Sequence, residues 1–280
     1  MLAADVCDSI IVDLTTRGIL VHGSAVLAAL GSLAARSEPR QYPSYDSVWL
    51  GRWRGACDLA AREDPAAYQN LMRLAQPLRT AESFTTRRCG SVIDAEAIEE
   101  TKRVIRAVDW KNIEYHEGQD FGRTLVHDDP YFNEMHRSLV ALASELAGEA
   151  LEPSYNFLSL YTDRGVCAPH MDAPSAKYTL DLCIEQSDPW PIHISQVVPW
   201  PEDHSYEGHD WAERIVNDRE LHFEEHVLEP GDALFFSGSS QWHYRNRHPQ
   251  NDQGFCNLVF FHFIPKGTRD FVRIFDPYLT

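Results

Sequence analysis

From residue 153 onward the chain is a succession of short apolar segments, and this feature restricts the available folds more than any other. The segments are rich in β-branched and aromatic residues, and glycine, proline or aspartate bounds them, which is typical of β-strands. They cover residues 155–161, 177–184, 191–195, 225–228, 232–236 and 255–263. Many short strands in succession predict a small barrel or a jelly roll.

The first half of the chain has a different pattern, in which apolar residues recur at helical spacing. Helices are predicted over about residues 25–37, 56–75, 91–110 and 130–150, with Ser24 as an N-cap and Asp64-Pro65 dividing the second helix. A short extended piece is predicted at residues 10–12. The two patterns predict an α+β fold. Residues 1–152 form a mainly helical support region that packs against a strand-rich core, residues 153–280.

Charge and hydropathy exclude several classes of function. The 280 residues carry a net charge of −17, whereas phosphate neutralisation needs a basic surface, so we expect no nucleic-acid partner. No apolar run approaches the roughly 20 residues that span a bilayer, so we expect no membrane association. The chain starts Met-Leu-Ala-Ala-Asp-Val-Cys-Asp, with acids where a signal peptide has basic residues, which predicts a cytoplasmic protein.

Cysteine usage agrees with this location. No two cysteines form a CxxC pair, and the scattered pattern predicts buried free thiols in a reducing compartment. They are Cys7, Cys57, Cys89, Cys167, Cys183 and Cys256.

The stretch from Tyr161 to Asp172 contains the first candidate site. In an extended segment, residues i and i+2 point to the same face, so the imidazole of His170 and the carboxylate of Asp172 are expected to converge. Two such groups can occupy neighbouring positions on a divalent metal. A third ligand would complete the facial triad of non-haem iron(II) oxygenases.

His243 is the candidate for the third ligand. A tight turn at Pro230-Gly231-Asp232 leads into an apolar strand, and His243 follows that strand after a loop of small residues. Two arginines, Arg245 and Arg247, come directly after it.

This ordered set of motifs resembles the iron(II)- and 2-oxoglutarate-dependent oxygenase superfamily, with its HxD…H motif on a double-stranded β-helix. The local details are similar to the prolyl-hydroxylase-like branch. Tyr161 and Gly165 precede the HxD, Pro-Gly-Asp-Ala-Leu at residues 230–234 precedes the distal histidine, and His243-Tyr244-Arg245 is similar to the His-Trp-Arg of some bacterial members. The resemblance covers about residues 153–264.

The resemblance implies that His170, Asp172 and His243 bind Fe(II), and that 2-oxoglutarate and O2 take the open positions on the metal. In halogenating relatives a small residue replaces the carboxylate. Because Asp172 is present, the resemblance implies hydroxylation or a related oxidation such as desaturation, cyclisation or dealkylation.

The distal carboxylate of 2-oxoglutarate needs a cation, preferably the forked guanidinium of arginine. The resemblance implies Arg245 for this role, with the Tyr161 hydroxyl as its partner and Arg247 as the alternative. Many relatives instead have a basic residue about ten positions after the distal histidine. This chain has only Gln-Gly-Phe-Cys-Asn at residues 253–257.

A small molecule, such as an amino-acid-derived or other secondary metabolite, is the expected substrate. The alternatives are a peptidyl or protein hydroxylase of the prolyl type, and a non-catalytic cupin-like barrel that binds a metal. Residues 197–224 read as an insertion between two strands and are expected, with Arg52 and Arg54, to influence substrate choice. Three tryptophans are candidates for the substrate pocket, although packing beneath a loop also explains them: Trp190, Trp200 and Trp211.

Residues 222–226 match the HxxEH motif of zinc peptidases. That motif needs a helix, because only there do histidines four residues apart share a face. Here apolar and polar residues alternate and a Pro-Gly turn follows, so we predict a strand and no peptidase site.

Overall fold

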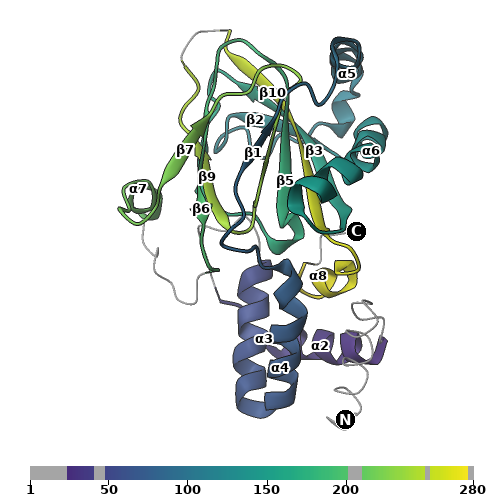
Figure 1. The fold of residues 1–280 in the computed structure, drawn as a ribbon, viewed down its shortest axis with the longest axis vertical. Coiled ribbons are helices and arrows are strands. Elements are labelled where there is room, and N and C mark those ends of the chain that lie inside the picture. Colours follow the sequence, from purple (N-terminus) through teal and green to yellow (C-terminus); the bar gives the residue numbers. More distant parts are fainter. Residues whose placement is uncertain (1–23, 41–47, 201–209, 250–252, 277–280) are drawn as a thin grey trace.

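The computed structural model describes residues 24–40, 48–200, 210–249 and 253–276 (Figure 1). The extended piece predicted at residues 10–12 and part of the predicted insertion, residues 201–209, lie outside these ranges.

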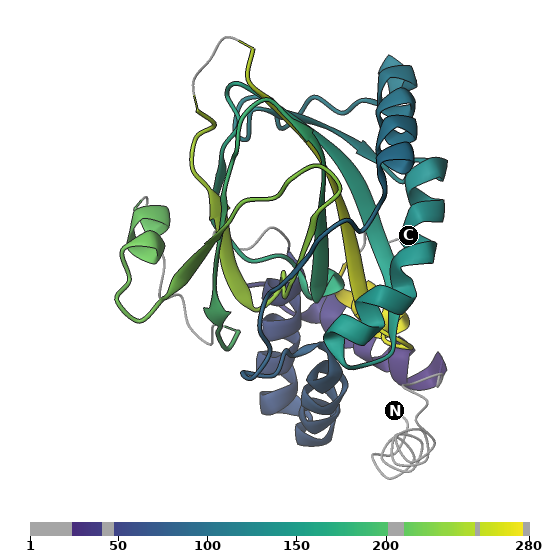
Figure 2. The same ribbon diagram turned by 45° about the horizontal axis from the view of Figure 1, so that its top comes forward.

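Two antiparallel sheets face each other and form the centre of the molecule (Figures 1 and 2). The larger sheet has the strand order β1-β8-β5-β10-β3-β2, and the smaller sheet has the order β4-β9-β6-β7. The strands are β1 (Arg87–Cys89), β2 (Arg123–His127), β3 (Leu151–Thr162), β4 (Cys167–His170), β5 (Tyr178–Gln186), β6 (Ile192–Val197), β7 (Phe223–His226), β8 (Ala233–Phe236), β9 (Gln241–Arg245) and β10 (Phe255–Pro265).

The chain crosses repeatedly between the two sheets. From β3 to β10, only β6 and β7 are consecutive strands of the same sheet. All neighbouring strands pair antiparallel. This mixed fold of helices and antiparallel sheets agrees with the predicted jelly-roll core.

The alternation of side chains along β10 explains how the larger sheet is buried on both faces. Leu258 belongs to a cluster with Ile192 and Ile194 of the smaller sheet, so it points between the sheets. Val259 belongs to a cluster with Phe132 of helix α6 (Pro130–Ala147), so it points to the outer face.

Two helices cover that outer face, α5 (Ala95–Ala107) and α6 (Figure 2). The side chains of Asp94 and Asp129 accept backbone N–H groups in the first turns of α5 and α6 and cap them. Helix α6 ends at Gly148, whose φ of +70° is a conformation that glycine adopts without strain.

A separate hydrophobic core, built mainly from helices and called the second helical core below, lies at one end of the sheets (Figure 1). The buried Trp49 donates a hydrogen bond from Nε1 to the carbonyl of Val272 (2.9 Å) and joins the N-terminal helices to the C-terminal one. These helices are α2 (Ser24–Arg36), α3 (Trp49–Glu63), α4 (Pro65–Ala75) and α8 (Arg269–Phe275). The remaining elements are η1 (Gln76–Leu78), η2 (Trp110–Asn112), η3 (Pro174–Ala176) and α7 (Trp211–Val216).

Several local predictions can be compared with these elements. Asp64 caps α4 as predicted, but α3 begins at Trp49, earlier than expected. Residues 223–226 form β7, which pairs with β6, so the HxxEH segment is extended as predicted. The region of residues 1–152 is not only helical, because β1 and β2 extend both edges of the larger sheet. Strand β9, which contains His243, was also not expected.

The five cysteines within the described ranges are free thiols. Cys89 is half-exposed, whereas the other four are buried as predicted. No helix in the described part of the chain is long and apolar enough to cross a membrane.

Candidate metal and co-substrate site

A cavity between the two sheets brings together five of the residues that the sequence singled out. Its lining includes His170, Asp172, His243, Tyr161 and Arg245. Aromatic rings make up much of the remaining wall, and they belong to Tyr155, Phe157, Phe236, Tyr244 and Phe260.

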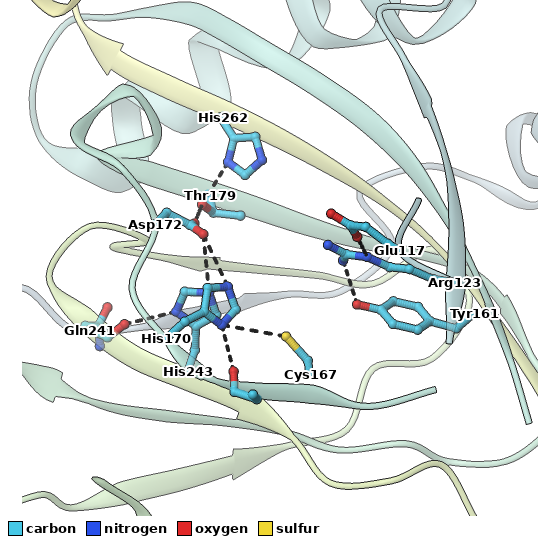
Figure 3. A network of polar contacts seen from close by, with 11 residues as sticks. Glu117, Arg123, Tyr161, Cys167, His170, Asp172, Thr179, Gln241, His243 and His262 are labelled. Carbon is cyan, nitrogen blue, oxygen red and sulfur yellow. Dashed lines mark hydrogen bonds and ion pairs between the residues drawn. The ribbon is translucent and has the colours of Figure 1, made fainter. Parts of the chain in front are cut away.

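Two of the predicted metal ligands, His170 and His243, lie on adjacent strands, and Asp172 follows the first of these strands. His170 is the last residue of β4 and pairs with His243 in the middle of β9. One ligand atom from each of these histidines and from Asp172 lies within 4.8 Å of the others. Asp172 Oδ1 is 3.5 Å from His170 Nε2 and 3.6 Å from His243 Nε2 (Figure 3). The HxD spacing and the register of β4 with β9 therefore produce the convergence.

Main-chain carbonyls orient both imidazoles. His170 Nδ1 donates to the carbonyl of Ala168 (2.9 Å), and His243 Nδ1 donates to that of Gln241 (3.0 Å). Since a carbonyl can only accept, each Nδ1 carries the hydrogen. Both Nε2 atoms face Asp172, and an Nδ1 hydrogen bond to a carbonyl is the usual support of a histidine that binds a metal through Nε2.

Asp172 is held on its other side by Thr179. The Thr179 hydroxyl donates to Oδ2 (3.1 Å), and the backbone N–H of Asp172 donates to the carbonyl of Gly238 (2.8 Å). Burial alone would raise the pKa of Asp172, but His243 and His170 beside it hold the pKa well below its usual value. The carboxylate is therefore an anion within reach of two imidazoles.

Gly238 is required by the close approach of this carboxylate. A Cβ atom at Gly238 would lie 2.2 Å from Asp172 Oδ2 and 2.6 Å from Thr179 Oγ1, closer than real Cβ contacts. Only glycine fits here without displacing Asp172 or Thr179.

The donor set fits Fe(II). Two imidazole nitrogens and one carboxylate oxygen on one side of a cavity match the facial triad, which leaves the opposite positions on the metal open. The hydrogen bonds from the two Nδ1 atoms and to Oδ2 are the supporting contacts that such ligands need.

Arg245 lines the cavity and is already paired. Its Nη2 donates to Asp181 Oδ2 (2.6 Å), and its Nη1 donates to the carbonyl of Trp190 (2.5 Å). Tyr161, the predicted partner of Arg245, is buried in the same wall. Arg247 is exposed and does not line the cavity.

Sequence reasoning missed a second arginine in this wall. Arg123 on β2 is buried and lines the cavity; its Nη1 donates to the Tyr161 hydroxyl (2.7 Å), and its Nε donates to Glu117 (Figure 3). Arg123 and Tyr161 face each other across the β2–β3 pair. The available signal was the short run Thr124-Leu125-Val126 after Gly122-Arg123, in the stretch between two predicted helices.

Sequence reasoning also missed His262. It is buried in the cavity wall on β10, with Nδ1 3.0 Å from the Thr179 hydroxyl. Because Thr179 gives its hydrogen to Asp172, His262 Nδ1 is the donor in this contact. Burial lowers the pKa of His262 to about 4, so the ring is neutral near pH 7.

The three candidate tryptophans pack elsewhere. Trp190 lies edge-on against Tyr161, with ring centroids 4.8 Å apart. Trp200 contacts two tryptophans of α3 in the second helical core, and Trp211 packs against the same core. None of the three lines the cavity. Arg52 and Arg54 are on α3, also outside the lining.

Comparison with known proteins places this geometry in context. A scan against protein-family models and a search of curated proteins found no match. Among solved structures, HygX from Streptomyces hygroscopicus, with nickel and 2-oxoglutarate bound, matches at 13% identity and a TM-score of 0.50, covering 70% of this chain and 86% of HygX. The epimerase SnoN, in complex with Fe3+, alpha-ketoglutarate and nogalamycin RO, matches at 14% identity and a TM-score of 0.51, covering 72% and 85%.

A prolyl-4-hydroxylase from Pseudomonas putida also matches, at 13% identity and a TM-score of 0.46, covering 69% of this chain and 100% of the hydroxylase. The likeness to HygX and SnoN shows that this chain shares the fold of these two proteins, whose structures hold a metal with 2-oxoglutarate or alpha-ketoglutarate, and this agrees with the resemblance that the sequence predicted.

Proposed function

We propose that this protein is an iron(II)- and 2-oxoglutarate-dependent dioxygenase that oxidises an unactivated C–H bond of a small molecule. The observation that carries the proposal is the convergence of two imidazoles and one carboxylate at a cavity that also contains buried cations. When bound, iron(II) with 2-oxoglutarate and O2 supplies the oxidising power, and succinate and CO2 are released. In this proposal the two sheets form a double-stranded β-helix.

The roles of the ligands follow from their contacts. Nε2 of His170, Nε2 of His243 and Oδ1 of Asp172 would hold the metal, because their remaining polar atoms already have hydrogen-bond partners. These partners fix the side chains before a metal binds, which reduces the ordering that binding requires.

Tyr161 and Arg245 would contribute to the co-substrate site. Both line the cavity, and Tyr161 lies within the electrostatic influence of Arg245 as well as Arg123. We assign them to the wall that receives the distal carboxylate of 2-oxoglutarate. The positive charge favours an anion, and the aromatic lining makes the surroundings less polar than water, which strengthens this interaction.

The lining supports a small substrate with apolar rings. Tyr155, Phe157 and Phe260 present aromatic surface to the cavity, on which such rings can pack. SnoN, which shares the fold, comes from nogalamycin biosynthesis, and this favours a secondary metabolite over a protein substrate. Because SnoN is an epimerase, the reaction class here includes hydroxylation and other oxidations that begin at a C–H bond.

Substrate-stimulated succinate release tests this proposal. The purified protein, loaded with Fe(II), would be incubated with 2-oxoglutarate and a library of metabolites, and proline-containing peptides would be included for the prolyl-hydroxylase alternative. We expect iron-dependent conversion of 2-oxoglutarate that a small molecule accelerates. If the protein binds Fe(II) but no 2-oxoglutarate, the cupin-like alternative replaces the proposal.

A further inference from the structure

Two buried arginines line the cavity, and each is paired with a carboxylate of a different kind. Arg245 is paired with Asp181, whose side chain is 0% exposed. Arg123 is paired with Glu117, whose side chain is 19% exposed and lies in the turns of residues 115–122 that precede β2. The two arginines therefore differ in how readily each partner can leave.

The Arg245 pair cannot be opened at low cost. Within the described structure Asp181 Oδ1 has no hydrogen-bond partner, so the bond to Arg245 is the contact that compensates this buried carboxylate. A ligand that took Arg245 away would leave an uncompensated charge in the interior, which is strongly unfavourable. Arg245 thus serves as a fixed part of the wall.

The Arg123 pair can be exchanged. Glu117 is already in contact with solvent, so its carboxylate can return to water when another carboxylate takes its place. The exchange needs only a side-chain movement. The main chain of the segment is tied down, because Phe121 O accepts from Val166 N (3.0 Å) and Gly122 O accepts from Thr162 N (2.9 Å).

Arg123 also has the geometry to bind a carboxylate. Its guanidinium lies over the rings of Phe121, Phe157 and Tyr161 at 4.6, 5.5 and 5.3 Å from their centroids, and this stacking fixes its plane. Of its five N–H groups, one binds Tyr161 and one binds Glu117. The planar guanidinium offers several N–H groups in a fork, and this arrangement matches the two oxygens of a carboxylate.

We propose that Arg123, together with Tyr161, binds the distal carboxylate of 2-oxoglutarate, and that Glu117 is an internal carboxylate that leaves Arg123 when the co-substrate enters. This inference rests on the proposed function and assigns the anchor of that site to a strand outside the expected core. Glu117 then competes with the co-substrate for Arg123, and before the co-substrate binds it neutralises the charge of this buried guanidinium.

Anaerobic binding measurements test the exchange. The Kd for 2-oxoglutarate would be measured on the Fe(II)-loaded protein from the metal-to-ligand absorption band, for the wild type, Arg123→Gln and Glu117→Gln. We expect Arg123→Gln to raise Kd by about 10- to 100-fold, the size of a lost charge-assisted pair. Glu117→Gln removes the competitor and is expected to lower Kd by roughly 3- to 10-fold.

A matched ligand provides the control. 2-Oxobutyrate keeps the groups that bind the metal but lacks the distal carboxylate, so neither substitution should change its Kd. If Arg123→Gln does not fold, Arg123→Lys retains the charge without the fork and should give a raised Kd. The Glu117→Gln measurement does not depend on whether either Arg123 variant folds.

The outcomes separate this inference from the proposed function. If the wild type binds 2-oxoglutarate and Arg123→Gln leaves its Kd unchanged, or Glu117→Gln raises Kd, the exchange is wrong and the proposed function survives. If the wild type binds no 2-oxoglutarate at all, the proposed function itself is wrong.

Discussion

The two walls of the cavity are built by different means. We call His170, Asp172 and His243 with Thr179 the triad wall, and Arg123, Arg245 and Tyr161 the arginine wall. On the triad wall, main-chain carbonyls two residues away orient both imidazoles. On the arginine wall, each guanidinium is held by a carboxylate that is distant in sequence or lies outside the strands.

This difference corresponds to two functions, metal binding and co-substrate binding. A site fixed by local backbone contacts has one arrangement, which suits ligands that must hold a metal in a set geometry. An ion pair whose carboxylate reaches solvent, such as Arg123–Glu117, can exchange one carboxylate for another, which suits a co-substrate that enters and leaves in every turnover. Changes to the triad wall should therefore abolish function, whereas changes to the arginine wall should alter affinity.

Asp172→Ala should have the largest effect. It removes the only anionic ligand of the triad, so we expect iron-dependent succinate formation to fall to the background rate while the protein stays folded. Iron content by elemental analysis and circular dichroism would be measured together with turnover. Retained turnover in a folded Asp172→Ala protein would remove the triad wall from the mechanism.

Gly238→Ala should have the next largest effect, although it changes no ligand. The added Cβ would lie 2.2 Å from Asp172 Oδ2, so the carboxylate must move. We expect the affinity for Fe(II) to fall by about 100-fold, the upper end of what supporting residues contribute. Gly31→Ala is a suitable control, because a Cβ there meets nothing within 4 Å.

Thr179→Val should weaken metal binding more mildly. The valine is similar in shape but cannot donate to Asp172 Oδ2, and it also breaks the contact with His262. We expect a loss of about 10-fold in Fe(II) affinity. A loss as large as that of Asp172→Ala would mean that Thr179 does more than orient the carboxylate.

His136 is a buried histidine outside the cavity, and its pH dependence tests whether burial keeps the imidazole neutral. Burial lowers the pKa of His136 to about 3, and its Nε2 donates to the carbonyl of His262 (3.0 Å). Below about pH 6.5 the unfolded chain takes up a proton at His136, whereas the folded protein does not. Protonation therefore favours the unfolded state, and the stability present above pH 6.5 is lost as the pH falls. Between pH 6.5 and pH 5 the free energy of unfolding should fall by roughly 2 kcal/mol because of His136.

Denaturant titrations across this pH range would measure the effect. His136→Gln should be less stable than the wild type near pH 7, and its stability should fall less steeply with acid. Equal pH dependence in the two proteins would show that His136 is not held neutral.

Arg247→Ala should have the smallest effect. The side chain is exposed and does not line the cavity, so we expect the Kd for 2-oxoglutarate to stay within about twofold of the wild-type value. Comparison of Arg247→Ala with Arg123→Gln distinguishes an arginine that lines the cavity from one that is only close to His243 in the sequence.

The two walls also differ in how far the sequence predicts them. The spacing of His170 and Asp172 indicated two ligands, and the resemblance of the turn and strand before His243 to a known motif implied the third. Arg123 is 38 residues from Tyr161, and their contact depends on the pairing of β2 with β3. No local pattern encodes that register, because Arg123 is an isolated charge beside a short apolar run.

The fold was predictable to a similar extent. The apolar segments after residue 153 correspond to strands, and the predicted cap at Asp64 marks the start of a helix. Strands β1 and β2 were missed because three and five residues carry too little periodic signal, and their partners come from distant parts of the chain. The packing of Trp200 against α3 likewise depends on tertiary contacts.

The most direct test of the triad is an anaerobic titration of the wild type and Asp172→Ala with Fe(II) and 2-oxoglutarate, followed by the metal-to-ligand absorption band. We predict a band in the wild type that saturates at one equivalent of Fe(II) and is absent from Asp172→Ala. No band in the folded wild type, or an equal band in Asp172→Ala, would contradict the proposal that His170, Asp172 and His243 hold the iron.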